Sequence, residues 1–147
     1  MRGAGWLNAC PIRQNAITAL NVPVSIGAAM ILKPQFQVLE VLKSIRRYRP
    51  TIFPGAPSMY VAINNFRGVR KYGIQSIKAC ISGSAPLPVE VQEAFEKLTK
   101  GKLVEGYGLT EASPVTHANP LNKNRRVGTI GVPLPSTEAV IVDLKTG

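Results

Sequence analysis

The residues best suited to do chemistry form one short run, Gly106-Tyr107-Gly108-Leu109-Thr110-Glu111. An apolar pair, Leu103-Val104, precedes it and is typical of the end of a short buried strand. The two glycines allow a sharp turn and a close approach of the backbone to a ligand. Tyr107 offers a flat face to a planar base, Thr110 a hydroxyl to a phosphate, and Glu111 a carboxylate to Mg²⁺. The run therefore predicts a nucleotide site at a strand end, with an ordinary turn as the simpler alternative.

A second loop of similar character follows the strand before it. Residues 77–81 are apolar except for Lys78 and predict a buried strand, after which Ser82-Gly83-Ser84-Ala85-Pro86 leads into a helix opened by Pro88. A strand, a helix and a strand at this spacing indicate a parallel pair joined by a right-handed crossover. Both loops then leave the carboxyl ends of neighbouring strands and border one crevice. Helix capping is the simpler role for Ser82 and Ser84.

The rest of the chain predicts further elements of the same α/β kind, a parallel sheet with flanking helices. Apolar residues recur at helical spacing over residues 36–48, and Pro57 suits the first turn of the next helix. Residues 67–75 form a basic loop whose glycines have the gap of a phosphate-binding P-loop but whose Lys and Ser/Thr are missing. A buried strand is expected at residues 29–32, and further strands at residues 51–53 and 139–143.

Several motifs occur in order along the chain. They are Tyr48-Arg49-Pro50-Thr51-Ile52-Phe53-Pro54-Gly55-Ala56-Pro57, Ser82-Gly83-Ser84-Ala85-Pro86-Leu87-Pro88, residues 106–111 and Gly128-Thr129-Ile130-Gly131-Val132-Pro133. This series resembles the adenylate-forming family, which includes acyl-CoA synthetases, firefly-type luciferases and peptide-synthetase adenylation domains. It looks most like the long-chain fatty acid–CoA ligases, from about Ala19 to the end of the chain. Ordered motifs at family spacing make this resemblance far more specific than any single motif.

The resemblance implies ATP-dependent activation of a fatty acid, with Mg²⁺ as cofactor and CoA as the second substrate. The fatty acid carboxylate would attack the α-phosphate of ATP, giving acyl-AMP and pyrophosphate, and the CoA thiol would then attack the acyl carbon. By matching position, Gly83, Ser84, Ala85 and Pro86 would cradle the adenosine, and Gly106, Tyr107, Gly108 and Leu109 would border the adenine and the acyl pocket. Thr110 would contact the α-phosphate and Glu111 would hold Mg²⁺, which makes these two the catalytic candidates. A core role for Tyr107 and a surface carboxylate for Glu111 are the alternatives.

The resemblance also implies that the chain is an internal part of the larger N-terminal domain of such an enzyme. We expect a poorly matching segment over residues 1–16, a partial AMP-binding domain over residues 17–136, and the start of a further β subdomain over residues 137–147. No Ser/Thr/Gly-rich loop ending in Pro-Lys-Gly is present to hold the β and γ phosphates. We therefore expect the chain to need the remainder of the enzyme and to be inactive alone. The alternative is a non-catalytic module that binds a nucleotide or docks on a partner chain.

Composition indicates which kinds of protein and of binding partner remain compatible with the sequence. The 147 residues are 45% hydrophobic and 18% charged, which suits one globular domain, and the net charge of +10 favours anionic partners. We expect no nucleic-acid partner, because no recognised binding module is present and aromatic residues do not interleave with the basic clusters. Residues 14–32 carry no charge but are too polar for a membrane span, so membrane contact would be peripheral. Cys10 and Cys80 without a secretory signal predict a reducing cytoplasm and a buried Cys80 thiol, and His117 is expected in a loop.

Overall fold

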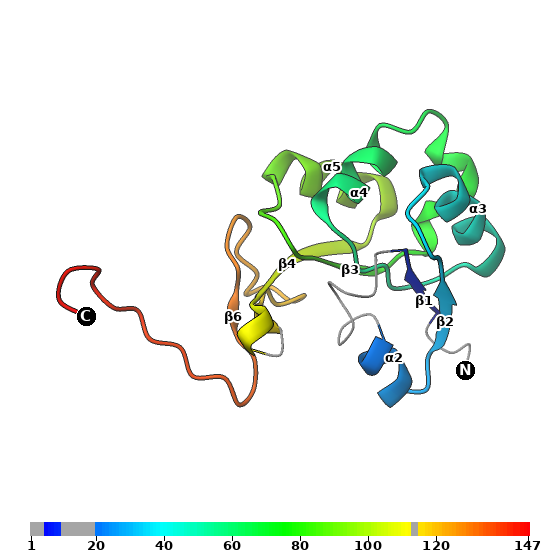
Figure 1. The fold of residues 1–147 in the computed structure, drawn as a ribbon. Helices are drawn as coiled ribbons and strands as arrows, with labels where there is room; N and C mark the ends of the chain where they lie inside the picture. The colour runs from blue at the N-terminus through cyan, green and yellow to red at the C-terminus, as the bar shows by residue number, and fades with distance from the viewer. Residues whose placement is uncertain (1–4, 10–19, 113–114) are drawn as a thin grey trace.

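The computed structural model describes residues 5–9, 20–112 and 115–147, and it confirms an α/β fold of parallel strands with flanking helices (Figure 1). The strands are β1 (Gly5–Asn8), β2 (Ala29–Leu32), β3 (Ala79–Ser82), β4 (Lys102–Gly108), β5 (Val115–Ala118) and β6 (Val132–Pro133). The α-helices are α2 (Val22–Ser25), α3 (Val38–Tyr48), α4 (Pro57–Asn64) and α5 (Val89–Thr99). The 3₁₀ helices are η2 (Val69–Tyr72), η3 (Ile74–Ser76) and η4 (Thr110–Ala112).

The parallel part of the sheet runs in the order β2, β1, the segment 52–55, β3 and β4. β1 pairs with β2 and β3 pairs with β4, both in parallel. Ile52 bridges Trp6 of β1 and Ala79 of β3, and Gly55 bridges Ser82. The strand predicted at residues 51–53 is therefore reduced to isolated bridges, and these bridges join the two strand pairs into one sheet.

Helices α3, α4 and α5 lie on one side of the sheet (Figure 1). α3 begins at Val38, within the predicted range, and its apolar spacing buries Val41, Leu42 and Ile45. It ends at Arg49, which takes the left-handed conformation (φ 52°) before Pro50. The periodicity of the sequence was therefore sufficient to locate this helix and its buried face.

Aromatic rings from the sheet and two helices meet in the core. The ring of Phe53 lies edge-to-face with Tyr60 of α4, with centroids 5.8 Å apart, and Tyr60 lies edge-to-face with Phe95 of α5 at 4.9 Å. All three side chains are buried. This row of rings binds α4 and α5 to the strands that carry the candidate site.

The strand before the Gly-Tyr-Gly motif is longer than predicted. β4 runs on to Gly108 instead of ending at Glu105, so the motif lies within a strand and is not a turn. Its first half pairs with β3, whereas its second half pairs antiparallel with β5, with a register shift between Tyr107 and Gly108. A register shift of this kind is typical of a β-bulge, which bends the strand that contains it. His117 pairs with Tyr107 and therefore lies in β5, not in the expected loop.

Other corrections concern exposure and the end of the chain. β2 is partly exposed rather than buried, because β1 is its only partner among the described strands. Residues 67–75 are not a plain loop, since they hold η2 and η3 and bury Val69 and Ile74. Residues 139–143 form no strand: no described segment pairs with them, and they run away from the sheet with their apolar side chains exposed (Figure 1).

The Cys80 thiol is free and buried, as predicted. Burial disfavours the thiolate and raises the pKa of Cys80, so the group behaves as a small apolar side chain. Cys10 lies outside the described residues. Across the described ranges, we find no helix with the length and apolar character needed to cross a membrane.

Candidate functional site

The candidate site lies where β3 and the middle of β4 run side by side (Figure 1). Ile81 pairs with Val104 and Ser82 pairs with Glu105 in parallel register. The loop after β3 and the second half of β4 therefore start from neighbouring positions. This confirms the prediction that the two motifs lie together at the carboxyl edge of the parallel strands.

A cavity of about 400 Å³ lies between the two motifs. The loop after β3 forms one wall, the second half of β4 forms another, and Ile130 contributes from the segment before β6. The volume falls within the range of about 300–1,000 Å³ that is usual for small-molecule sites. The lining residues are Ser84, Ala85, Pro86, Glu105, Gly106, Tyr107, Gly108 and Ile130.

Backbone geometry shapes the loop after β3. The Gly83 N–H donates to Gly55 O at 3.2 Å, and Ser84 takes the left-handed conformation (φ 72°). That conformation is uncommon for a residue with a side chain and is found at ligand sites more often than elsewhere. The capping alternative for Ser82 and Ser84 is wrong, because α5 starts after Pro88 with no side-chain cap. The buried Ser82 hydroxyl makes no hydrogen bond within the described part of the chain.

A side chain at position 106 would require the Ile81 side chain to shift. A Cβ there would lie 2.7 Å from Cδ1 and 3.0 Å from Cγ1 of Ile81 on the neighbouring strand. Tyr107 follows, 42% exposed, with its ring edge-to-face to His117 and the two centroids 6.2 Å apart. This exposure excludes the core role that was the alternative for Tyr107. The ring instead stands beside the cavity, where a planar ligand could reach it.

Glu105 is a site residue that the sequence analysis missed. It lines the cavity, and its Oε1 accepts a hydrogen bond from the Leu87 N–H at 3.4 Å. The contact ties the end of the loop after β3 to β4. A carboxylate at the end of an apolar run was the available sequence signal.

Leu109, Thr110 and Glu111 lie beyond the cavity and not in its wall. Thr110 and Glu111 belong to η4, and all three residues are exposed. The structure thus brings Ser84 to Pro86 and Gly106 to Gly108 together around one cavity. Of the predicted site residues, Gly83, Leu109, Thr110 and Glu111 do not line it. Within the described ranges, no group of three or more His, Cys, Asp or Glu residues is placed to hold a metal ion.

Ile130 reaches the cavity because Asn119 organises the segment that carries it. Asn119 is buried; its Nδ2 donates to Thr129 O at 2.9 Å, and its Oδ1 accepts from the Arg126 N–H at 3.0 Å. The Asn119 N–H donates to Glu105 O at 2.9 Å, which joins the segment to β4.

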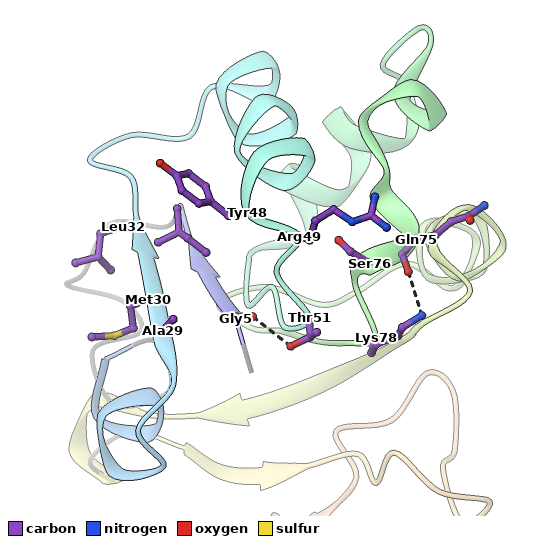
Figure 2. A pocket seen from close by; sticks show the side chains of 11 residues that line it. Gly5, Ala29, Met30, Leu32, Tyr48, Arg49, Thr51, Gln75, Ser76 and Lys78 are labelled. Atoms are coloured by element: carbon purple, nitrogen blue, oxygen red, sulfur yellow. Dashed lines mark hydrogen bonds between the residues drawn. The ribbon is translucent and has the colours of Figure 1, made fainter. Parts of the chain in front are cut away.

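A larger hollow of about 870 Å³ lies at the opposite edge of the sheet (Figure 2). It runs along β2 and past the amino-terminal starts of the parallel strands. Tyr48, Arg49 and Lys78 border it, and Lys78 Nζ donates to Gln75 O at 3.1 Å (Figure 2). No residue of the loop after β3 or of the second half of β4 lines it. We therefore take the smaller cavity as the candidate site, because it unites the two motifs.

Known proteins share both sequence and fold with this chain. The AMP-binding enzyme family model matches residues 13–147. A long-chain-fatty-acid–CoA ligase of Bacillus subtilis is 52% identical over 128 residues, which cover 87% of this chain and 23% of that protein. A 4-coumarate–CoA ligase of Narcissus pseudonarcissus is 33% identical over 128 residues, which cover 82% of this chain and 23% of that protein.

The fold comparison agrees with the sequence comparison. The crystal structure of ATP-bound MatB from Rhodopseudomonas palustris has a TM-score of 0.86 and 27% identity, covering 100% of this chain and 29% of that one. The chain thus spans about a quarter of the length of the relatives that it matches. Since its motifs, its fold and the family model all agree, the chain belongs to the AMP-binding enzyme family, the adenylate-forming family whose motifs it carries.

Proposed function

We propose that the cavity between the two motifs binds the adenosine of ATP, as one part of the site of an acyl-CoA ligase. The observation that carries the proposal is that both motifs line one cavity, Ser84 to Pro86 on one side and Gly106 to Gly108 on the other. Membership of the AMP-binding family supports an adenine nucleotide as the ligand. The ATP bound in the MatB crystal structure supports the same class of ligand.

The lining suits a ligand that is planar and polar. The half-exposed Tyr107 ring would stack on the base, and base–aromatic stacking is worth about 1–3 kcal/mol. The Glu105 carboxylate and the peptide groups of residues 84–86 would supply hydrogen-bonding partners for the base and ribose. Together these groups would orient the adenosine against β4.

We assign the phosphate side of the ligand to the residues that follow β4. Thr110 would donate its hydroxyl to the α-phosphate, and Glu111 would hold Mg²⁺. The exposed Glu111 carboxylate fits this ion, which proteins bind through one or two carboxylates while phosphate and water supply its other ligands. When bound, Mg²⁺ offsets the negative charge that develops at phosphorus. A position beyond the cavity wall is consistent with groups that meet phosphates and not adenosine.

We also propose a long-chain fatty acid as the acyl substrate and CoA as the acceptor of the acyl group. The relative that is 52% identical is named for long-chain fatty acids, whereas the relative that is 33% identical is named for 4-coumarate. The greater similarity to the first supports a fatty acid over an aromatic acid.

We expect the 147-residue chain alone to form no acyl-CoA at a useful rate. It lacks a Pro-Lys-Gly phosphate loop, so the charge developing at phosphorus would not meet a full set of cations. The measurement is acyl-CoA formation from ATP, CoA and palmitate, with 4-coumarate offered in a parallel reaction. Robust product from either acid would contradict this expectation.

The test of the nucleotide site is Tyr107→Ala. We expect it to weaken the binding of AMP by about five- to a hundredfold, because the stacking energy of the base is lost. The side chain is half exposed, so its removal spares the core. Isothermal titration of AMP into the chain measures the affinity. Thermal unfolding with and without AMP provides a second reading, since a ligand that binds only the folded state raises stability.

Tyr48→Ala is the matched control. Tyr48 is 51% exposed and borders the larger hollow (Figure 2). We expect this variant to bind AMP within about twofold of the unaltered chain. Weakened binding in Tyr48→Ala with normal binding in Tyr107→Ala would place the nucleotide in the larger hollow and refute the proposal. Failure of the unaltered chain to bind AMP would refute it as well.

A further inference from the structure

Among the described residues, no strand pairs with one edge of β4 over its first residues. β4 pairs with β5 only from Gly106 onward. The Lys102 N–H bonds to Lys78 O on the β3 side, so strand alternation directs the peptide groups of Leu103 to the other edge. Leu103 is buried, and a buried peptide group without a partner costs about 1–3 kcal/mol. Groups other than a strand must therefore bond to Leu103.

Three side chains take the place of the missing strand. Glu96 Oε1 accepts the Leu103 N–H at 2.8 Å. Gln92 Nε2 donates to Leu103 O at 2.6 Å, and Arg125 Nη1 donates to the same oxygen at 3.3 Å. Gln92 and Glu96 come from α5, whereas Arg125 comes from the segment between β5 and β6. Through Arg125, that segment is thus joined to α5 at Glu96 and to β4 at Leu103.

Arg125 and Glu96 also form a two-point ion pair. Arg125 Nη2 lies 3.1 Å from Glu96 Oε2, and Nη1 bonds to Oε1. The two side chains are only 15% and 19% exposed, whereas those of the Lys43–Glu40 pair on α3 are 58% and 44% exposed. The hydrogen bond to Glu96 raises the pKa of Arg125 above its ordinary value. A sheltered pair is screened less by salt, and loss of one partner leaves the other charge uncompensated.

The contacts continue from this pair to the cavity. Arg126, next to Arg125, donates its N–H to the Asn119 side chain, which in turn donates to Thr129 O. Thr129 precedes Ile130, which lines the cavity. The segment is therefore held to the body of the fold through the Asn119 N–H on Glu105 and through Arg125 on Glu96, and its far end is held by the pairing of Val132 with Ala118.

We propose that Arg125, acting through Glu96, is a positioning residue that holds Ile130 as a wall of the nucleotide cavity. The inference rests on the proposed function, because it concerns the same cavity. Arg125 itself does not line the cavity. Any effect of Arg125 on nucleotide affinity would therefore be indirect, through the segment that it tethers or through Leu103 of β4, to which it also bonds.

The test is Arg125→Met, which keeps an aliphatic stem but loses the contacts with Glu96 and Leu103. AMP affinity of the 147-residue chain is expected to fall by about tenfold at a temperature where the chain is fully folded. Amide hydrogen exchange is expected to quicken at Arg126, whose N–H bonds to Asn119, and not at Lys102, whose N–H joins β4 to the β3 side. A merely structural role would lower thermal stability but would leave the affinity of the folded chain unchanged.

Two further variants complete the design. Arg125→Lys keeps the charge and one point of contact and should restore part of the affinity. Lys123→Met removes an exposed charge from the same segment and should leave affinity and exchange unchanged. The proposal is wrong if Arg125→Met binds AMP normally, or if the Arg126 and Lys102 amides quicken together. If the unaltered chain binds no AMP, the proposed function fails separately, and selective exchange at Arg126 decides whether Arg125 tethers the segment.

Discussion

Phe95→Ala is expected to lower the free energy of unfolding by about 3–5 kcal/mol. Phe95 on α5 is fully buried, and its ring meets Tyr60 of α4 with centroids 4.9 Å apart. Its removal would leave a hole where the two helices meet the sheet, so the cost includes lost contacts as well as lost burial. Urea unfolding followed by circular dichroism measures the change as a lower midpoint at constant slope.

The hole would stay open because Tyr60 is held in place. The Tyr60 hydroxyl lies 3.0 Å from Phe53 O and 3.1 Å from Ile81 O, so it can donate to either carbonyl. A shift of the ring toward the hole would break this bond inside the core. Val89→Ala, on the exposed start of the same helix, is the control and should change stability by less than about 0.5 kcal/mol. Equal losses in the two variants would show that the ring does not carry the helix packing.

Gly131→Ala is expected to destabilise the chain by about 2–4 kcal/mol. Gly131 has φ +90°, and a Cβ there would overlap the backbone of Ala118 and Asn119 at the end of β5. Backbone atoms in a strand cannot rotate away as a side chain can, so β6 must separate from β5 or the segment must shift. Either movement displaces the neighbouring Ile130, and AMP affinity should fall together with stability.

The loss of stability in Gly131→Ala has two causes, the left-handed conformation and the overlap with the end of β5, and Gly128→Ala separates them. Gly128 also has a positive φ (+76°), but a Cβ there would meet only Val89 Cγ2, at 3.9 Å. The variant should therefore cost about 1 kcal/mol, the penalty of the left-handed conformation alone. Urea unfolding of the two variants side by side measures the overlap as their difference. Losses of the same size would mean that the end of β5 does not press on Gly131.

Local sequence pattern was enough for the helices and for the place of the site. Apolar spacing located α3 with its buried Val41 and Ile45. The strand–helix–strand order placed Ser82 and Glu105 together, because parallel neighbours joined by a helix end at the same edge. The ordered motifs identified the family, which the family model then matched over residues 13–147.

The course of the chain after Glu105 could not be read from local pattern. Glycines normally weaken a strand, yet Gly106 and Gly108 continue β4, because β5 returns to pair with them. Residues 139–143 have the composition of a strand but form none, since pairing requires a neighbour and no described segment supplies one. Strand formation depends on partners that lie far away in the sequence.

The third wall of the cavity, formed by Ile130, could not be predicted from the sequence either. Ile130 lines the cavity from a segment that Asn119 folds and that Arg125 joins to Glu96, 29 residues earlier in the chain. Helical and strand periods report which face of an element is apolar, and motif order reports ancestry. Neither reports which distant side chain will bond to a bare peptide group such as that of Leu103. That choice arises only when α5, β4 and the returning segment pack together and buried polar groups must find partners.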